Sequence, residues 1–403
     1  MRVYMAPCGI GLGHITRMHP IAKELNARGF DTIFSTYLDG LAYAKQYALP
    51  TFEAAPINFR VKNDGTIDFK LTAATSGFSL GIRTFLRQLV FEIRFMKLFK
   101  PDVVFSDSRA SSLLAAWLLR IPVVLMLNQF RVEIMHRPSK KQLSMLDRLF
   151  FVIANMGWLF IRTAIELVWG KSQAILIPDL PDPYTISLGN LAIPKRYNGK
   201  VKLIGPIVEA GNVPSFSVNQ LRRRLGLTTT KPIIYAAVSG PRIEREVLTK
   251  LLTKALSHAA RKDEIILSRG KPDGTLSVHM SNGLRIFDWI QNQDDYIMAS
   301  DVIVGRAGHG TIMKSLVYGK PMILIPIPDH TEQYGNARRA ESLKVARIID
   351  QSNLNSDTLD IALNELLTKP DYHRNAKRVQ KSASSMQAIK IACDLVENFA
   401  ART

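Results

Sequence analysis

The stretch that decides the fold is Gly305-Arg306-Ala307-Gly308-His309-Gly310-Thr311, which joins the apolar run 301–304 to a helix-like run. A glycine turn between a strand and a helix aims several backbone N–H groups at one point, where an anion can bind. A second such turn, His330-Thr331-Glu332-Gln333-Tyr334-Gly335-Asn336-Ala337, follows the apolar run 321–327 and again opens a helix. Two helix N-termini beside neighbouring strand ends predict a cradle for a nucleotide diphosphate and its sugar.

Short apolar runs of the same kind alternate with amphipathic helical patterns along the whole chain. They lack period-two alternation, so they predict parallel strands buried on both faces in an α/β architecture. The runs are residues 3–5, 32–35, 103–105, 123–127, 174–177, 233–238, 264–267, 284–287, 302–304 and 322–325. The pattern breaks at the Gly- and Pro-containing stretch 205–230. We expect two doubly wound Rossmann-like domains facing a central cleft, residues 1–207 and 208–403, with the last helix able to pack back on the first domain.

Composition narrows the class of protein. The chain has 403 residues, 47% of them hydrophobic, which suits two domains with large cores. Its only cysteines, Cys8 and Cys393, indicate neither a disulfide framework nor a cysteine metal site, and they fit a reducing interior. The first residues predict a strand and not a signal peptide. Lys and Arg total 53 against 34 Asp and Glu, and the net charge of +19 indicates an anionic partner: nucleic acid, an anionic membrane surface or phosphorylated substrates.

Two segments of the first half carry a pattern typical of membrane binding. On a helical wheel the basic arc holds Arg83, Arg87, Arg94 and Lys97, and a broadly opposite apolar arc holds Phe85, Leu86, Leu89, Ile93 and Met96. Residues 149–161, which include Phe151 and Trp158, are uncharged but too short to span a bilayer. An ordinary surface helix and a buried core helix are the alternatives. The basic residues nearby favour peripheral attachment to an anionic membrane surface.

The N-terminal motif Gly9-Ile10-Gly11-Leu12-Gly13-His14 directly follows the first predicted strand. A Rossmann dinucleotide fingerprint would need glycine at His14, so that interpretation fails in its usual form. A neutral imidazole at the mouth of a glycine loop can remove a proton from a hydroxyl; a capping or core histidine is the alternative. Asp107, just past the run 103–105, could orient that imidazole or cap the helix that follows.

In this order and spacing, the motifs resemble GT-B-fold glycosyltransferases. The chain is similar to the family 28 N-acetylglucosaminyltransferase that completes lipid II of peptidoglycan, and more loosely to UDP-glycosyltransferases. The residues that match are Gly11-Leu12-Gly13-His14, Asp107, Arg306-Ala307-Gly308-His309-Gly310-Thr311 and Glu332-Gln333-Tyr334-Gly335-Asn336-Ala337. The resemblance covers most of the chain.

The resemblance implies a role for each matched residue. His14 and Asp107 would be catalytic, beside an acceptor loop at Gly11 and Gly13. The donor diphosphate would lie over Arg306, Gly308, His309, Gly310 and Thr311, with Ser239, Gly240 and Arg242 closing over it. Phe287, Trp289 and Ile290 would cradle the base, and Glu332 and Gln333 would bind the donor sugar. Lys314 stands where family members commonly have the Glu that binds the ribose, so the ribose contact is changed or the pocket accepts extra negative charge. UDP stays the favoured nucleotide.

The expected activity is inverting, metal-independent transfer of a sugar from a nucleotide-sugar, with UDP-sugar favoured. The acceptor would be a hydroxyl or phosphate of a membrane lipid or lipid-linked molecule at the inner face of the cell membrane. We expect no cofactor beyond this co-substrate, because no cluster of His, Asp and Glu demands a divalent ion. A sugar-nucleotide epimerase on the same fold and a non-catalytic GT-B membrane partner subunit stay open. A nucleic-acid binder is disfavoured, because aromatic stacking platforms and known motifs are lacking.

Overall fold

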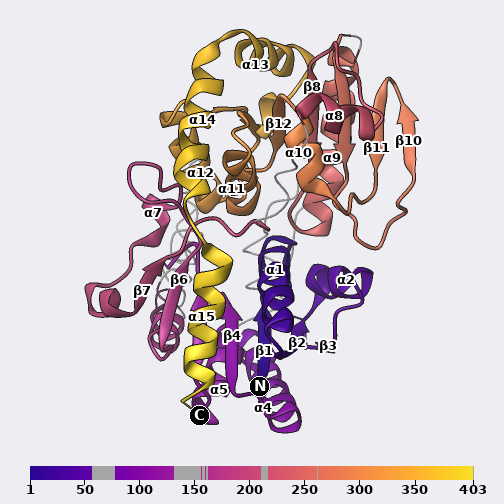
Figure 1. The fold of residues 1–403 in the computed structure, drawn as a ribbon. Helices are drawn as coiled ribbons and strands as arrows, with labels where there is room; N and C mark the ends of the chain where they lie inside the picture. The colour runs from indigo at the N-terminus through magenta and orange to yellow at the C-terminus, as the bar shows by residue number, and fades with distance from the viewer. Residues whose placement is uncertain are drawn as a thin grey trace, which may run out of the picture.

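The computed structural model describes residues 1–56, 78–130, 156, 159, 162–209, 217–260 and 262–402. These residues form two seven-stranded sheets in the orders β3-β2-β1-β4-β5-β6-β7 and β10-β11-β9-β8-β12-β13-β14. Each sheet is the centre of its own layered domain, and the two domains are stacked end to end (Figure 1). The ten predicted apolar runs all form strands, and the predicted doubly wound α/β fold is confirmed.

The first domain places a parallel sheet between two hydrophobic cores. Alternate residues of its central strand enter different cores, with Val3 and Met5 on one face and Tyr4 and Ala6 on the other. Its strands are β1 (Arg2–Pro7), β2 (Asp31–Thr36), β3 (Thr51–Glu53), β4 (Val103–Asp107), β5 (Val123–Met126), β6 (Ala174–Ile177) and β7 (Val201–Leu203). Its helices include α1 (Gly13–Ala27), α2 (Leu38–Gln46), α4 (Phe78–Phe99), α5 (Ala110–Leu118) and α7 (Leu188–Leu191), together with the 3-10 helix Lys195–Lys200, and residues 162–169 are also helical.

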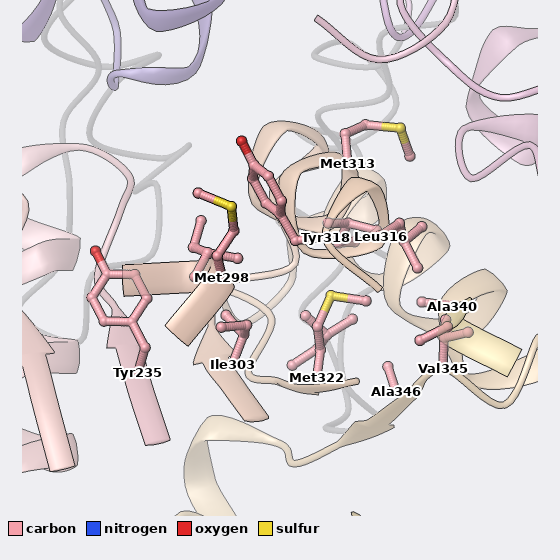
Figure 2. Close-up of a cluster of buried hydrophobic side chains, with 14 of the residues drawn as sticks. Tyr235, Met298, Ile303, Met313, Leu316, Tyr318, Met322, Ala340, Val345 and Ala346 are labelled. Carbon is pink, nitrogen blue, oxygen red and sulfur yellow. The ribbon is translucent and has the colours of Figure 1, made fainter. Parts of the chain in front are cut away.

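The second domain repeats this plan with one antiparallel edge, where β10 pairs with β11. Its strands are β8 (Ile233–Ala237), β9 (Glu264–Ser268), β10 (Val278–Ser281), β11 (Leu284–Phe287), β12 (Val302–Gly305), β13 (Met322–Leu324) and β14 (Ala346–Ile348). Its helices are α8 (Val218–Arg224), α9 (Arg242–Ala259), α10 (Gln293–Ala299), α11 (His309–Val317), α12 (Thr331–Ser342), α13 (Ser356–Thr368) and α14 (Pro370–Ser384), with a 3-10 turn at Gln351–Asn353. Figure 2 shows one of its cores, where Leu316 and Tyr318 lie over Ile303 and Met322.

The last helix, α15 (Ala388–Ala400), leaves the second domain and runs down beside α1 of the first (Figure 1). Its Ala392, Cys393 and Val396 are buried in a core of the first domain. Arg28, at the C-terminal end of α1, adds ion pairs to two acidic residues of this helix. The chain therefore crosses between the domains twice, which ties them together at two places.

The predicted amphipathic helix exists, but its apolar arc is used for packing. In α4, Met96 is buried, while Leu89 and Ile93 pack against the same core of the first domain. Buried Glu92 of this helix pairs with buried Arg109, which anchors it further. The basic arc points outward, together with the exposed side chains of Leu86, Val90 and Leu98. Leu86 therefore departs from the predicted apolar arc.

The second predicted membrane segment, with Phe151 and Trp158, lies outside the described residues. Within the ranges that the structure describes, no helix is both long enough and apolar enough to cross a bilayer.

Candidate functional site

The loop between β1 and α1 contains glycines at positions where a side chain would clash or strain the backbone. A Cβ at Gly9 would lie 2.1 Å from the carbonyl oxygen of Tyr37, so only glycine fits there. Gly11 has a φ of +69°, in the left-handed region that favours glycine. Its N–H donates to Asp39 Oδ2 at 3.1 Å. The loop delivers the next residues, Gly13 and His14, to the first turn of α1.

His14 and Asp107 meet as the sequence predicts. Asp107 ends strand β4 and is fully buried, and its Oδ1 lies 2.8 Å from Nδ1 of His14, whose side chain is 24% exposed. Neither residue caps a helix, because the N-caps of α1 and α5 are Leu12 and Arg109. The pair therefore joins a buried carboxylate to an imidazole that solvent can reach.

Arg17, which sequence analysis missed, completes this pair one helical turn after His14. Its Nε donates to Asp107 Oδ2 at 2.5 Å, and its Nη2 donates to Oδ1. Burial alone would raise the pKa of Asp107, but the guanidinium of Arg17 and the imidazole of His14 hold it well below its usual value. His14 Nδ1 lies nearer to Asp107 Oδ1, at 2.8 Å, than to Arg17 Nη2, at 3.3 Å. We therefore place the proton on Nδ1, which leaves Nε2 as the acceptor.

Helix α11 of the second domain opens with space above its first turn. Its N-cap is Gly308, and no acidic residue lies in that turn. A Cβ built at Gly308 or at Gly310 would meet no atom of the described residues within 4 Å. Both glycines lack the side chain that would screen the helix N-terminus, so an anion can approach the backbone N–H groups closely.

Two residues predicted to touch the diphosphate are turned elsewhere. His309 is buried, and its Nε2 lies 3.2 Å from Asp179 Oδ2 of the first domain, without the angle of a hydrogen bond. Burial raises the pKa of Asp179, but His309 and hydrogen bonds from Ser187 bring it down to about 2. His309 therefore offers a ligand only its backbone in this structure.

Arg306 lies beneath the α11 turn and is only 1% exposed. Its Nη1 donates to the carbonyl of Ile325, whereas its Nε and Nη2 have no hydrogen-bond partner among the described residues. Burial lowers its pKa to about 10, so it stays charged at neutral pH. A guanidinium buried here would act on an anion above the turn through its electric field and not by contact.

The 239–242 loop touches the first domain directly. Gly240 has a φ of +109°, and a Cβ at Gly11 would lie 3.8 Å from its carbonyl carbon. Arg245 bridges the two loops: its Nη1 donates to Gly240 O at 3.2 Å and its Nη2 to Asp39 Oδ1 at 2.7 Å. Ser239 lies half-buried in this loop, while Arg242 is exposed and faces its helix neighbour Glu246.

A buried acidic residue that was not predicted from the sequence, Glu244, follows this loop in the chain. Glu244, in the first turn of α9, is 3% exposed. Burial raises its pKa to about 7, although the charge of Arg306 acts in the opposite direction.

The two residues predicted to bind the donor sugar, Glu332 and Gln333, make different contacts. Glu332, in the first turn of α12, accepts a hydrogen bond at Oε1 from Asn128 Nδ2 of the first domain, at 2.6 Å. Gln333 is buried, and its Oε1 accepts from the backbone N–H of Ile327 at 3.0 Å. Glu332 therefore faces the seam between the domains, and Gln333 holds the loop that precedes its helix.

The predicted base-binding side chains are used for packing. Trp289 is 3% exposed and lies in a core of the first domain, where its Nε1 donates to Tyr47 Oη at 3.3 Å. Ile290 is buried in a core of the second domain, and the Phe287 ring packs 5.7 Å from the ring of Tyr296. A nucleobase would therefore meet mainly the backbone of this segment.

Lys314 is paired within the second domain. Its Nζ lies 2.8 Å from Asp294 Oδ1, and Tyr318 donates its hydroxyl to Asp294 Oδ2 at 3.1 Å. The lysine charge is matched by this carboxylate, so it does not by itself call for an extra phosphate on the ligand.

Within the described ranges, no group of three or more His, Cys, Asp and Glu side chains is arranged to hold a metal ion.

Comparisons with known proteins agree with this arrangement. Residues 244–391 match the model of the glycosyltransferase family 28 C-terminal domain. A Methanosarcina mazei protein named as a glycosyltransferase is 28% identical over 409 residues, which cover 100% of this chain and 99% of the relative. The UDP-N-acetylglucosamine–N-acetylmuramyl-(pentapeptide) pyrophosphoryl-undecaprenol N-acetylglucosamine transferase of Clostridium novyi is 27% identical over 176 residues, 42% of this chain and 48% of that one.

Solved structures confirm the fold. A Streptomyces sp. SF2575 glycosyltransferase complexed with thymidine diphosphate superposes with a TM-score of 0.63 at 16% identity, over 99% of both chains. The predicted resemblance to family 28 is therefore confirmed, and the solved structures confirm the predicted GT-B fold. A transferase is favoured over the epimerase, the non-catalytic subunit and the nucleic-acid binder.

Proposed function

We propose that this chain, a glycosyltransferase of the GT-B fold, moves a sugar with inversion from a UDP-sugar to a hydroxyl or phosphate oxygen of a lipid or lipid-linked acceptor. The observation that carries the proposal is that the N-terminus of α1 in the first domain and the N-terminus of α11 in the second face the boundary between the domains and differ in what they present. On one side the partly exposed His14 is backed by buried Asp107. On the other, the α11 turn leaves open space over Gly308 and Gly310.

The chemistry follows from this geometry. A hydroxyl oxygen of the acceptor attacks the anomeric carbon, and its proton passes to Nε2 of His14; an ionised phosphate oxygen would attack without this proton transfer. The bond from that carbon to the diphosphate breaks, and the nucleoside diphosphate leaves with the electron pair. Asp107 stabilises the imidazolium that forms, as in triad chemistry. The N-terminus of α11 and the charge of Arg306 beneath it stabilise the departing anion, which is the role that a metal ion has in other transferases.

Two observations bear on the nucleotide. The Clostridium novyi relative is named for a UDP-sugar, and the Streptomyces structure was solved with thymidine diphosphate. Both are pyrimidine nucleoside diphosphates, and the Lys314–Asp294 pair adds no net charge to the predicted ribose site. We therefore favour UDP and test dTDP beside it.

The lipid acceptor rests on charge and on the name of one relative. The Clostridium novyi relative acts on a pyrophosphoryl-undecaprenol substrate by its name. Here α4 of the first domain turns four basic side chains outward among exposed Leu86, Val90 and Leu98. A basic face interrupted by aliphatic side chains suits the surface of an anionic membrane, and the net charge of +19 adds to that attraction.

A calorimetric and thermal-shift screen of UDP, dTDP, GDP, ADP and their sugar conjugates tests the donor. Stabilisation follows RT ln(1 + [L]/Kd), so ligand at a hundredfold excess over Kd should add about 2.7 kcal/mol. We expect a selective shift with UDP or dTDP. Vesicles containing phosphatidylglycerol and polyprenyl phosphate, incubated with the labelled donor selected by the screen, then test for transfer to lipid.

The outcomes separate the parts of the proposal. Donor binding without any labelled lipid would remove the lipid acceptor and keep the donor site. A shift with GDP alone would overturn the choice of nucleotide. The absence of a shift with every nucleotide at millimolar concentration, with vesicles present, would overturn the donor site itself.

A further inference from the structure

Arg17 holds two partners at once. Its Nε and Nη2 grip both carboxylate oxygens of Asp107 in a forked arrangement. Its Nη1 and Nη2 each lie 3.3 Å from Oδ1 of Asn128, just beyond the end of β5. A planar guanidinium with five donors can make both sets of contacts, whereas a lysine ammonium cannot reproduce the fork.

Asn128 carries this connection across the seam. It is 8% exposed, and its amide uses both of its ends: Oδ1 accepts from Arg17, and Nδ2 donates to Glu332 Oε1 at 2.6 Å. A continuous chain of hydrogen bonds therefore joins His14, Asp107, Arg17, Asn128 and Glu332. Its two ends are the proposed base and the carboxylate proposed to bind the donor sugar.

We propose that Arg17 and Asn128 are positioning residues that set the acceptor-side base in register with the donor-side carboxylate. This inference rests on the proposed function. Arg17 fixes the orientation of Asp107, and through it the ring of His14. Asn128 engages one oxygen of Glu332, which turns that carboxylate in a fixed direction. Displacements well below the length of a hydrogen bond matter here, because in-line transfer needs the acceptor oxygen and the anomeric carbon in near-attack geometry.

The location of these residues explains why they act on catalysis more than on donor binding. Arg17 and Asn128 belong to the first domain, whereas the proposed diphosphate site over Gly308 and Gly310 belongs to the second. Their loss would disturb alignment across the seam and leave the diphosphate contacts intact. The expected signature is a fall in kcat with a small change in donor affinity.

The test uses Arg17→Gln, Arg17→Lys, Asn128→Ala and the double variant Arg17→Gln/Asn128→Ala, with the donor and acceptor that the wild-type screen selects. Where only donor hydrolysis is measurable, nucleotide release is followed. We expect Arg17→Gln to lower kcat about a hundredfold and Asn128→Ala about tenfold, with donor Kd within threefold. Arg17→Lys should recover part of the loss, because it keeps the charge beside Asp107. The double variant should be close to Arg17→Gln alone, because both residues act through one chain of contacts.

Arg28→Gln is the matched control, since Arg28 lies on the same helix and pairs with Asp394 and Glu397 away from the seam. It should change stability and leave kcat unchanged. An unchanged kcat in folded Arg17→Gln, or losses that multiply in the double variant, overturns the inference. If Arg17→Gln does not fold, Asn128→Ala decides, because it leaves the Arg17–Asp107 pair in place. A wild type that neither binds nor turns over a donor would instead overturn the proposed function.

Discussion

The two glycine-led helix starts of this molecule share a backbone design and differ in what surrounds it. At α1, the N–H of Gly11 donates to Asp39, and the first turn, although it is open at Gly13, carries His14 against Asp107. At α11, the turn is open: in the part of the chain that the structure describes, no atom lies within 4 Å of a Cβ built at Gly308 or Gly310, and His309 is turned away toward Asp179. The first start therefore presents a side chain, and the second presents backbone.

The difference comes from what the neighbouring strand ends supply. Beside α1, strand β4 ends in a buried carboxylate, so a histidine there has its imidazole oriented and suits the proposed role of a base. Beside α11, the nearby charged groups are Arg306 and Glu244, which are buried and influence the local charge. One local motif can thus serve proton transfer or anion binding, and the tertiary partners decide which.

The largest effect should come from His14→Ala. Loss of a general base lowers kcat by about 10²–10⁴-fold, and donor Kd by calorimetry should stay within twofold, because His14 lies on the acceptor side. His258→Ala is the control, since that histidine lies in the last turn of α9 and pairs with Asp360. If donor Kd rose together with the loss of kcat, the start of α1 would also contribute to donor binding, which contradicts the proposed separation of proton transfer from donor binding.

Titration of Glu244, on the donor side of the molecule, should make the free energy of unfolding depend on pH. Burial raises the pKa of Glu244 from 4.5 to about 7, so between these values the folded state keeps a proton that the unfolded chain has lost. Stability should therefore fall as pH rises from 4.5 to 7, by roughly 3 kcal/mol at most. Urea denaturation across this range measures the fall, and Glu244→Gln should abolish it. Glu246→Gln, on the exposed side of the same helix, should not; equal slopes in both variants would refute the assignment.

Gly310→Ala tests the open turn directly. The position is helical and exposed, and a Cβ there would meet no described residue within 4 Å, so alanine should stabilise the protein by about 0.5–1 kcal/mol. The same methyl group should weaken UDP or dTDP binding about tenfold or more, because it occupies the space over the backbone N–H groups. Gly13→Ala, the matching open position of α1, should leave nucleotide affinity unchanged. If calorimetry showed that Gly310→Ala binds UDP or dTDP as tightly as the wild type or more tightly, the diphosphate would not bind over this turn.

The sequence predicted the interior of the fold better than its edges. All ten apolar runs became strands, and the four strands it did not name, β3, β7, β10 and β14, are the outer strands of the two sheets. An outer strand has a neighbour on one side only and need not be buried on both faces; every residue of β10 is exposed. Such strands lack the continuous apolar run on which the prediction depended.

For the site, positions along the chain were predictable and side-chain directions were not. His14 and Asp107 could be paired, because parallel strand ends and helix starts meet at one edge of a sheet. Nothing in the local pattern showed that His309 would turn to Asp179, or that Trp289 would pack on Tyr47. These partners lie more than a hundred residues away in the other domain. Arg17 carried a usable signal, its place one turn after His14 on the predicted helix.

Substitution of Lys314 should give the smallest effect, a change in nucleotide affinity at the donor side without a change in kcat. In isolation it suggested a pocket for extra negative charge, yet Asp294, twenty residues upstream, already matches it. Lys314→Glu would face two carboxylates toward each other, so we expect nucleotide affinity to fall about threefold to tenfold without a change in base preference. The charge swap Lys314→Glu/Asp294→Lys should recover most of it, and kcat at saturating donor should barely change in either variant. If Lys314→Glu alone tightened UDP binding, the lysine would be a determinant of nucleotide choice and not half of an internal ion pair.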